Sequence, residues 1–393
     1  MYLNNHSYYS LRYGTIEVEQ LVEQAAKLGI GSLAMTDINN TMGMVDFVKA
    51  CRRKGIKPIA GVEFRNGDQL MYVALARNNK GFGELNKMLT RHNLDQSPYP
   101  ELAPPLEDVV VVYPAGKRKP AQLLDNEYIG VRLSQVARLL TSELRFHQHK
   151  LLLLQPVTFT DAQSWYIHKN LRAIDHNTLL SKLTTEQCAA SDEFMLPPER
   201  LAAAFVLYPQ LLETTRSIVE DCGIDFDFST IKNRKTFTGN ATDDRKLLHK
   251  LAFEGMEYRY GAKNAQARKR VEEELAIIDK LGFSAYFLIT WDVIRYSMSR
   301  GFYHVGRGSG ANSIVAFCLR ITDVDPIELD LYFERFLNPK RSSPPDFDID
   351  YSWKERDEVI DYIFKRYGHT HTALLGTIST FRGKSIYREL GKV

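Results

Sequence analysis

The chain has 393 residues, of which 44% are hydrophobic and 25% are charged, and 51 Lys and Arg against 48 Asp and Glu give a net charge of +3. This composition is typical of globular proteins and excludes disordered, collagen-like and coiled-coil chains. No apolar run approaches the roughly 20 residues that cross a membrane, and the first residues show no signal peptide. We therefore expect a cytoplasmic protein with no membrane partner, built from two or three domains.

The first part of the chain alternates helical and strand-like segments. The predicted helices cover residues 16–28 and 45–53, and the predicted strands cover residues 32–36, 56–64, 70–76 and 109–113. This alternation with short breaks indicates a parallel sheet or barrel covered by helices. Chemistry in such folds lies at the C-terminal ends of the strands, where this sequence carries Asp37 and Glu63.

The character of the sequence changes near residue 225, where we place a domain boundary. A basic stretch follows at residues 232–235, and a charged amphipathic helix is predicted over residues 268–281. Either basic region, 232–235 or 268–270, could contact DNA, but ordinary solvated charge is the favoured interpretation of both.

A glycine-rich turn at residues 306–313 precedes an apolar run. Glycines allow the backbone to approach a ligand closely, and free N–H groups at the start of a following helix would attract an anion. Arg307, Ser309 and Ser313 could add side-chain donors to phosphate oxygens. A tight structural turn accounts for the same residues equally well, because the sequence matches neither a P-loop nor a dinucleotide-binding fingerprint.

Residues 345–351 read Pro-Asp-Phe-Asp-Ile-Asp-Tyr, so that acidic and apolar residues alternate. In a strand, Asp346, Asp348 and Asp350 share one face and the apolar residues pack from the other. Adjacent carboxylates repel one another unless a cation compensates. Oxygen ligands without His or Cys favour Mg²⁺, and two carboxylates can bridge a metal pair for nucleotidyl transfer. Solvated acids on an edge strand and a calcium loop are the weaker alternatives.

These motifs resemble the palm of the C-family of bacterial replicative polymerases, the family of the DNA polymerase III alpha subunits. The resemblance extends to the sequence Phe-Glu-Arg-Phe-Leu-Asn-Pro at residues 333–339, and residues 5–7, 35–37 and 57–63 resemble the PHP domain of the same family. The resemblance implies an α/β fold: a PHP-type α/β barrel over residues 1–225, then the first part of a polymerase-β-like nucleotidyltransferase palm, mixed α/β, over residues 226–393.

The resemblance implies an enzyme for DNA-templated DNA synthesis, in which a primer 3′-hydroxyl attacks a dNTP at a palm site with two Mg²⁺ ions. By motif, Asp346 and Asp348 would be catalytic, and Asp350 would complete the metal-binding carboxylates. The candidate nucleotide and phosphate contacts are Arg307, Gly308, Ser309, Arg335, Lys340 and Lys384. For the basic residues Arg335 and Lys384, a solvated surface role is the alternative. The implied partners are primer–template DNA and dNTPs.

The family places a third catalytic acid, the fingers and the clamp-binding regions further along the chain. We therefore expect residues 1–393 to be a truncated piece that is inactive alone. Contacts with the sliding clamp and other replisome subunits would come from regions outside residues 1–393.

The PHP metal cluster implied by the resemblance is incomplete in this sequence. Positions where the family pattern places His hold Asn4, Ile38, Met71 and Gln163. The acids and the imidazole that remain are His6, Asp37, Glu63 and Asp161, which we interpret as relics of a lost metal site, because Ile and Met cannot replace imidazole as a ligand. A PHP-type metal-dependent phosphoesterase or 3′–5′ exonuclease, and a non-catalytic PHP scaffold for the polymerase, are the alternative functions.

Overall fold

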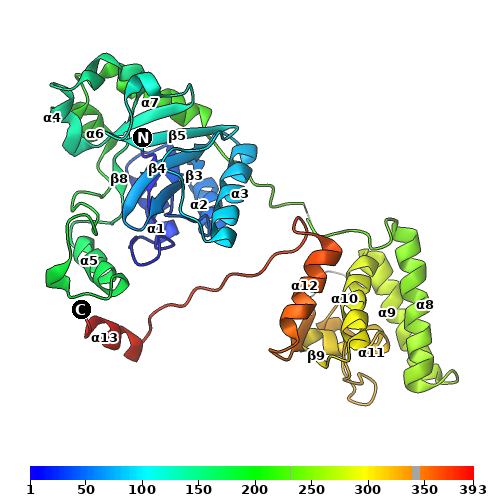
Figure 1. The fold of residues 1–393 in the computed structure, drawn as a ribbon. Helices are drawn as coiled ribbons and strands as arrows, with labels where there is room; N and C mark the ends of the chain where they lie inside the picture. Colours follow the sequence, from blue (N-terminus) through cyan, green and yellow to red (C-terminus); the bar gives the residue numbers. More distant parts are fainter. Residues whose placement is uncertain (231, 339–345) are drawn as a thin grey trace. The chain divides into compact units, whose positions relative to one another are not determined.

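The computed structural model describes residues 1–230, 232–338 and 346–393 (Figure 1). The chain forms two compact units. The first unit comprises Met1–Asp227 together with Thr380–Val393, and the second comprises Phe228–Ser379. The domain division after residue 225 stays a prediction, and the end of the predicted palm packs with the first unit. Every helix among the described residues is too short or too polar to cross a lipid bilayer.

The first unit is built from eight strands and eight α-helices among the described residues. Its strands are β1 (Asn4–Asn5), β2 (Ser32–Met35), β3 (Lys57–Asn66), β4 (Gln69–Ala76), β5 (Val109–Pro114), β6 (Glu127–Val131), β7 (Leu151–Leu153) and β8 (Pro156–Val157). Its helices are α1 (Val18–Lys27), α2 (Met44–Lys54), α3 (Asn79–Asp95), α4 (Val136–Leu139), α5 (Ser164–Asp175), α6 (Pro198–Ala204), α7 (Pro209–Asp221) and α13 (Lys384–Leu390).

The central sheet of the first unit has the order β2-β3-β4-β5-β6-β7 and curls into a half-barrel (Figure 1). The α/β class is as predicted, but the expectation of parallel strands is wrong in part. β3 pairs antiparallel with β4, and β4 pairs antiparallel with β5, whereas β2–β3, β5–β6 and β6–β7 are parallel. The reason is that only Gly67 and Asp68 connect β3 to β4, and a two-residue connection can join only antiparallel neighbours.

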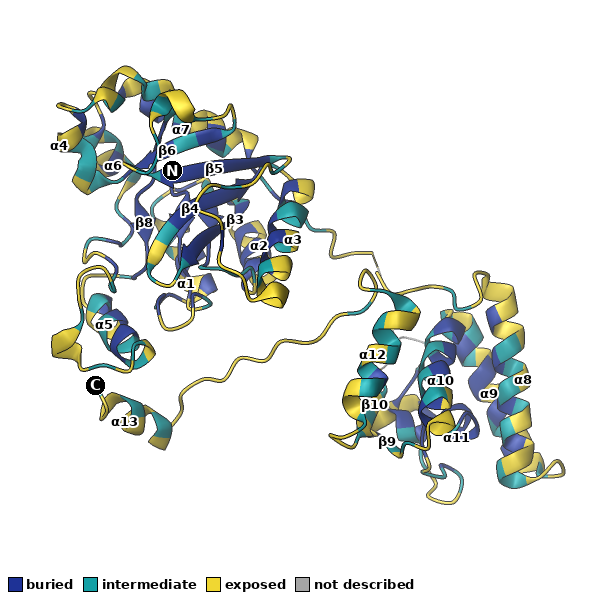
Figure 2. Cartoon of the chain, in the orientation of Figure 1, coloured by how far each residue is buried: buried dark blue, intermediate teal, exposed yellow. Residues whose placement is uncertain are grey.

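Both faces of this sheet are buried (Figure 2). Along β5, Val109, Val111 and Tyr113 belong to the core cluster that contains the apolar residues of α1, α2 and α3, whereas Val110 and Val112 belong to a second cluster with α7. A strand covered on both faces needs a continuous apolar sequence, which explains the predicted strand at 109–113.

The second unit is mainly helical among its described residues. Its helices are α8 (Ala241–Tyr260), α9 (Ala265–Leu281), α10 (Ser284–Ser299), α11 (Ile314–Cys318) and α12 (Arg356–Tyr367), and its strands are β9 (His304–Arg307) and β10 (Asp348–Tyr351). The predicted end of α9 is confirmed, because Gly282 follows it at a φ of +71° as a left-handed cap. The core of this unit gathers buried apolar residues from α8, α9, α10 and α11.

Candidate active site

The predicted glycine-rich turn and the predicted acidic strand are neighbours in the second unit. β9 leads into the turn and pairs antiparallel with β10, so that Arg307 lies opposite Asp348 and Gly306 lies opposite Ile349. Two motifs that are separate in the sequence therefore form one surface.

The two faces of the acidic segment differ, as the alternation predicts. Asp346, Asp348 and Asp350 are exposed, whereas Phe347 packs into the core of the unit. The ring of Phe347 stacks on Tyr286 with centroids 5.2 Å apart, and the Phe347 N–H donates to the Tyr286 hydroxyl at 2.8 Å. β10 begins at Asp348, so Asp346 precedes the paired strand.

Arg307 lies against the acidic strand. Its Nε donates to Asp350 Oδ2 at 2.6 Å, and its Nη1 lies 3.7 Å from Asp348 Oδ2. The hydrogen bond to Asp350 and the charges of both carboxylates raise the pKa of Arg307. The guanidinium of Arg307 therefore offsets part of the repulsion between Asp348 and Asp350. The sequence predicted that a metal ion would compensate this repulsion.

The oxygen donors on β10 suit a hard divalent cation. Asp348 and Asp350 lie two residues apart on one face of the strand. Within residues 1–230, 232–338 and 346–393, no group of three His, Cys, Asp or Glu side chains is arranged to hold a metal ion. Mg²⁺ commonly takes one or two carboxylates and fills its other positions with water and substrate phosphates. Asp348 and Asp350 fit Mg²⁺ if water and substrate phosphates fill its other coordination positions.

Two glycines of the turn are required by close contacts. A Cβ on Gly306 would lie 2.0 Å from the carbonyl oxygen of Ile321, which is too close for any side chain. Gly308 has a φ of +74°, and a Cβ there would lie 2.8 Å from Asp348 Oδ2. The turn thus brings its backbone directly against the acidic strand.

The N-terminus of α11, which follows the turn, is occupied by a carboxylate of the protein itself. Glu274 of α9 accepts a hydrogen bond from the Ser313 hydroxyl at 2.9 Å and from the N–H groups of Ile314 and Val315 at 3.1 and 3.2 Å. Burial raises the pKa of Glu274 to about 7, although these hydrogen bonds and Arg270 oppose the shift. The expectation of free N–H groups and a phosphate-facing Ser313 is therefore wrong.

The other predicted phosphate contacts come from several different elements of the chain. Gly308 and Ser309 are exposed in the turn next to Asp348, and Arg335 is exposed at the end of a short 3₁₀ segment. Lys384 is the first residue of α13, which belongs to the first unit. Lys340 lies outside the described residues. The roles of these residues stay predictions.

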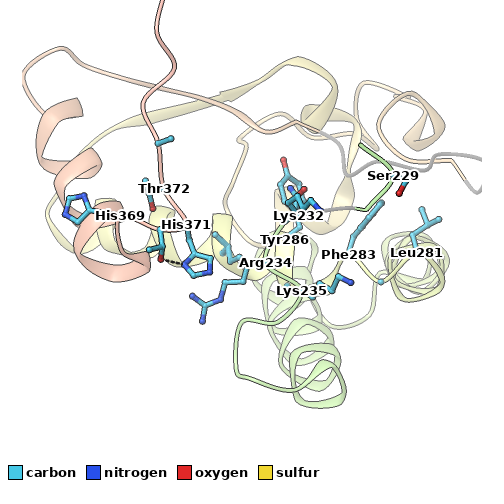
Figure 3. Close-up of a pocket in the computed structure, with 16 residues that line it drawn as sticks. Ser229, Lys232, Arg234, Lys235, Leu281, Phe283, Tyr286, His369, His371 and Thr372 are labelled. Carbon is cyan, nitrogen blue, oxygen red and sulfur yellow. Dashed lines mark hydrogen bonds between the residues drawn. The ribbon is translucent and has the colours of Figure 1, made fainter. Parts of the chain in front are cut away.

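A cavity of about 900 Å³ lies in the second unit (Figure 3). Ser229, residues 232–235 and residues 369–373 line it, and Leu281 and Phe283 contribute an apolar part. Arg234 and Lys235 are exposed there, and Tyr286, which holds Phe347, lines the same cavity. The basic stretch at 232–235 thus borders a cavity rather than a flat surface.

In the first unit, the structure brings some of the predicted relic residues together. His6 Nε2 lies 3.2 Å from Glu63 Oε2, and Asn4 donates to the same oxygen at 2.7 Å. Arg65 Nε donates to Glu63 Oε1 at 2.5 Å, and its Nη2 donates to the Tyr13 hydroxyl at 3.0 Å. Burial opposes ionisation of Glu63, but Arg65 and His6 outweigh it and hold the pKa of Glu63 below its usual range.

Sequence reasoning did not identify Arg65 as part of this cluster. The signal available was its position two residues after Glu63 on β3. Its guanidinium supplies a positive charge beside the buried Glu63 carboxylate.

Asp37 and Asp161 have different surroundings. Asp37 is buried and accepts hydrogen bonds from the Ser7 and Ser10 hydroxyls, each at 2.7 Å. Burial raises the pKa of Asp37, although these hydrogen bonds oppose the shift. Asp161 is exposed and accepts from the N–H of Ser164 at 2.9 Å, at the start of α5. Asp161 thus makes a local contact with the first residue of α5.

Two domain families match this chain. Residues 3–117 match the PHP domain, and residues 246–393 match the bacterial DNA polymerase III alpha NTPase domain. The whole chain aligns with DNA polymerase III subunit alpha of Bacillus subtilis (strain 168) at 32% identity. It is homologous to the bacterial DNA polymerase III alpha subunits.

Other relatives of this alpha-subunit homologue agree with that assignment. The whole chain is 30% identical to DNA polymerase III subunit alpha of Escherichia coli (strain K12), and 30% identical to an error-prone DNA polymerase of Symbiobacterium thermophilum. The chain spans 38% of the length of each alpha subunit and 41% of the error-prone polymerase. The predicted resemblance to the DNA polymerase III alpha subunits is confirmed, and an error-prone DNA polymerase is among the relatives.

Proposed function

We propose that this alpha-subunit homologue takes part in DNA-templated DNA synthesis, the transfer of nucleotides from dNTPs to the 3′-hydroxyl of a primer. The pairing of the glycine-rich turn with the acidic strand carries the proposal, because it puts the backbone proposed to contact phosphate and the carboxylates on one surface. The relatives named as DNA polymerases support it.

Asp346 and Asp348 are the proposed catalytic carboxylates, and Asp350 is the proposed supporting acid. When bound, Mg²⁺ would lower the pKa of the primer hydroxyl and stabilise the leaving pyrophosphate. The exposed backbone of Gly308 and Ser309 would contact the triphosphate. Arg307, which precedes Gly308 in the turn and now pairs with Asp350, would donate to the same phosphates.

Primer extension tests this proposal in the natively encoded protein that contains these residues. Asp348→Asn removes one negative charge from the site and should abolish primer extension with Mg²⁺ and all four dNTPs. Asp357→Asn is the matched control, because Asp357 is an exposed acid on α12 that pairs with Arg356. Normal extension by Asp348→Asn would show that the acidic strand is structural.

For the first unit, the buried Arg65–Glu63 pair favours a non-catalytic scaffold over a metal-dependent phosphoesterase. A guanidinium next to Glu63 repels a metal ion and occupies the carboxylate that would bind it. The metal content of the purified chain after dialysis against Zn²⁺ or Mn²⁺ tests this interpretation. A stoichiometric load that Glu63→Gln removes would favour the phosphoesterase.

A further inference from the structure

A basic pocket lies at the end of β5 in the first unit, and its lining shares no residue with the Glu63 cluster or with the acidic strand. It has a volume of about 570 Å³ and lies between the loop after β5 and the segment that contains α4. Lys117, Arg118 and Lys119 line it from the loop, and Arg138 lines it from α4. Its volume falls within the range of small-molecule sites.

The loop is held in place by its own contacts. Arg118 Nη1 donates to Glu127 Oε2 at 2.9 Å, and Arg118 lies over the ring of Tyr113. The N–H of Lys117 donates to the Pro114 carbonyl at 3.2 Å, which closes a turn. Arg118 therefore fixes the loop, and its two basic neighbours remain available to the pocket.

Three of the four cations lack a carboxylate partner. Within the described part of the chain, Lys117, Lys119 and Arg138 form no ion pair, and Glu143 is the one acid that lines the pocket. Lys117 Nζ lies 3.4 Å from the Met71 thioether, which carries no charge to offset it. Burial lowers the pKa of Lys117, and Glu101 opposes the shift.

The remaining lining combines apolar and neutral polar groups. Val131, Leu139 and Leu144 supply apolar surface, and Gln135 and Ser142 supply hydrogen-bonding groups. A pocket with unpaired cations and an apolar wall is suited to an anion that also carries an organic group.

We propose that this pocket binds a phosphate-bearing ligand without a metal ion, with Lys117, Lys119 and Arg138 as its phosphate contacts. The guanidinium of Arg138 can donate two parallel hydrogen bonds to one phosphate, and the lysines act as point charges. A nucleoside triphosphate and inorganic pyrophosphate share this chemistry. The apolar wall would add a contact only for the nucleotide.

Calorimetric titration in EDTA tests the proposal with pyrophosphate, ATP and adenosine as separate ligands. Lys117→Gln combined with Arg138→Gln should weaken pyrophosphate binding at least tenfold. The control is Arg53→Gln, which removes an exposed cation that pairs with Glu19 in the same unit. Equal affinity of the double variant and the original chain would overturn the proposal, as would an equal loss in the control.

The same titration identifies the ligand. Equal affinity for pyrophosphate and ATP assigns the site to phosphate alone, whereas tighter binding of ATP assigns it to a nucleotide. Binding of adenosine as tight as that of ATP would overturn the role of the cations. The thermal unfolding midpoint of the double variant should equal that of the original chain, because neither cation has an ion-pair partner to lose among the described residues.

A further variant separates this site from the proposed polymerase site. Asp348→Asn combined with Asp350→Asn removes the acidic strand in the second unit, and pyrophosphate should still bind in EDTA. Loss of binding in that variant would assign the ligand to the acidic strand and overturn the proposal. If primer extension fails but pyrophosphate still binds in EDTA, the proposed polymerase function is wrong and the proposal for this pocket stands.

Discussion

Glu274 accepts a hydrogen bond from Ser313 at 2.9 Å, although the two residues are 39 positions apart in the chain. The pair ties α9 to the start of α11, and both side chains are buried. The glycine-rich turn ends at Ser313, so one end of the turn is fixed to the core of the second unit by this contact.

The stability of the second unit should depend on pH through Glu274. Its pKa rises from 4.5 to about 7 on folding because of burial, so between these values the folded state keeps a proton that the unfolded state has lost. The free energy of unfolding therefore falls as the pH rises through this range, by about 3 kcal/mol in total. Urea unfolding between pH 4.5 and 8 measures the slope.

In Glu274→Gln, which cannot titrate, this slope should disappear. Glu272→Gln changes an exposed acid on the same helix and should keep the slope. An unchanged slope in Glu274→Gln would assign the pH dependence to other groups.

Gly306→Ala should destabilise the second unit by about 1–3 kcal/mol, because its Cβ would collide with the carbonyl oxygen of Ile321. Gly376→Ala is the control, since nothing lies within 4 Å of a Cβ at that exposed position. Urea unfolding measures both variants. An unchanged free energy of unfolding in Gly306→Ala would mean that β9 shifts easily away from the segment after α11.

Arg65→Met should destabilise the first unit by about 3–5 kcal/mol, because it leaves the buried Glu63 carboxylate without its cation. Since the pKa of Glu63 is lower in the folded state, the contribution of the pair is present above pH 4.5 and is lost as the pH falls. Thermal unfolding at pH 7 measures the loss. Adding Glu63→Gln to Arg65→Met should restore part of it; no recovery would show that packing of Arg65, rather than charge, is responsible.

Arg234→Gln combined with Lys235→Gln should weaken binding of a labelled primer–template, if the cavity they line takes DNA phosphates. Fluorescence anisotropy at several salt concentrations should give a slope of log Kd against log salt that is smaller by up to about 2. Arg268→Gln with Lys269→Gln is the control on α9, where Lys269 faces Glu273. Equal effects of the two double variants would indicate non-specific attraction.

Local periodicity was enough to predict the elements that surround both sites. The apolar spacing predicted α1, α2 and α9, and the alternation at 346–351 predicted which side chains of β10 are exposed. These features depend on residues within a few positions of one another, which a sequence pattern records directly.

Contacts across the fold were not predictable in the same way. The direction of β4 depends on a two-residue connection that composition does not reveal. The carboxylate at α11 comes from another helix, and Arg65 joins the cluster of His6 and Glu63 only because β3 places it beside Glu63 and Tyr13. In each case the deciding partner is fixed by tertiary packing.

The close approach of Gly308 to Asp348 has a consequence for the order in which ligands bind. Under the proposed function, a triphosphate on this turn would lie beside carboxylates of like charge, and the two would repel each other until a cation stands between them. Nucleotide and cation would then each raise the affinity for the other by the same factor. In the two-stranded sheet of β9 and β10, nucleotide binding would therefore require the cation, and the ligand that arrives second would displace Arg307 as the counter-ion of Asp350.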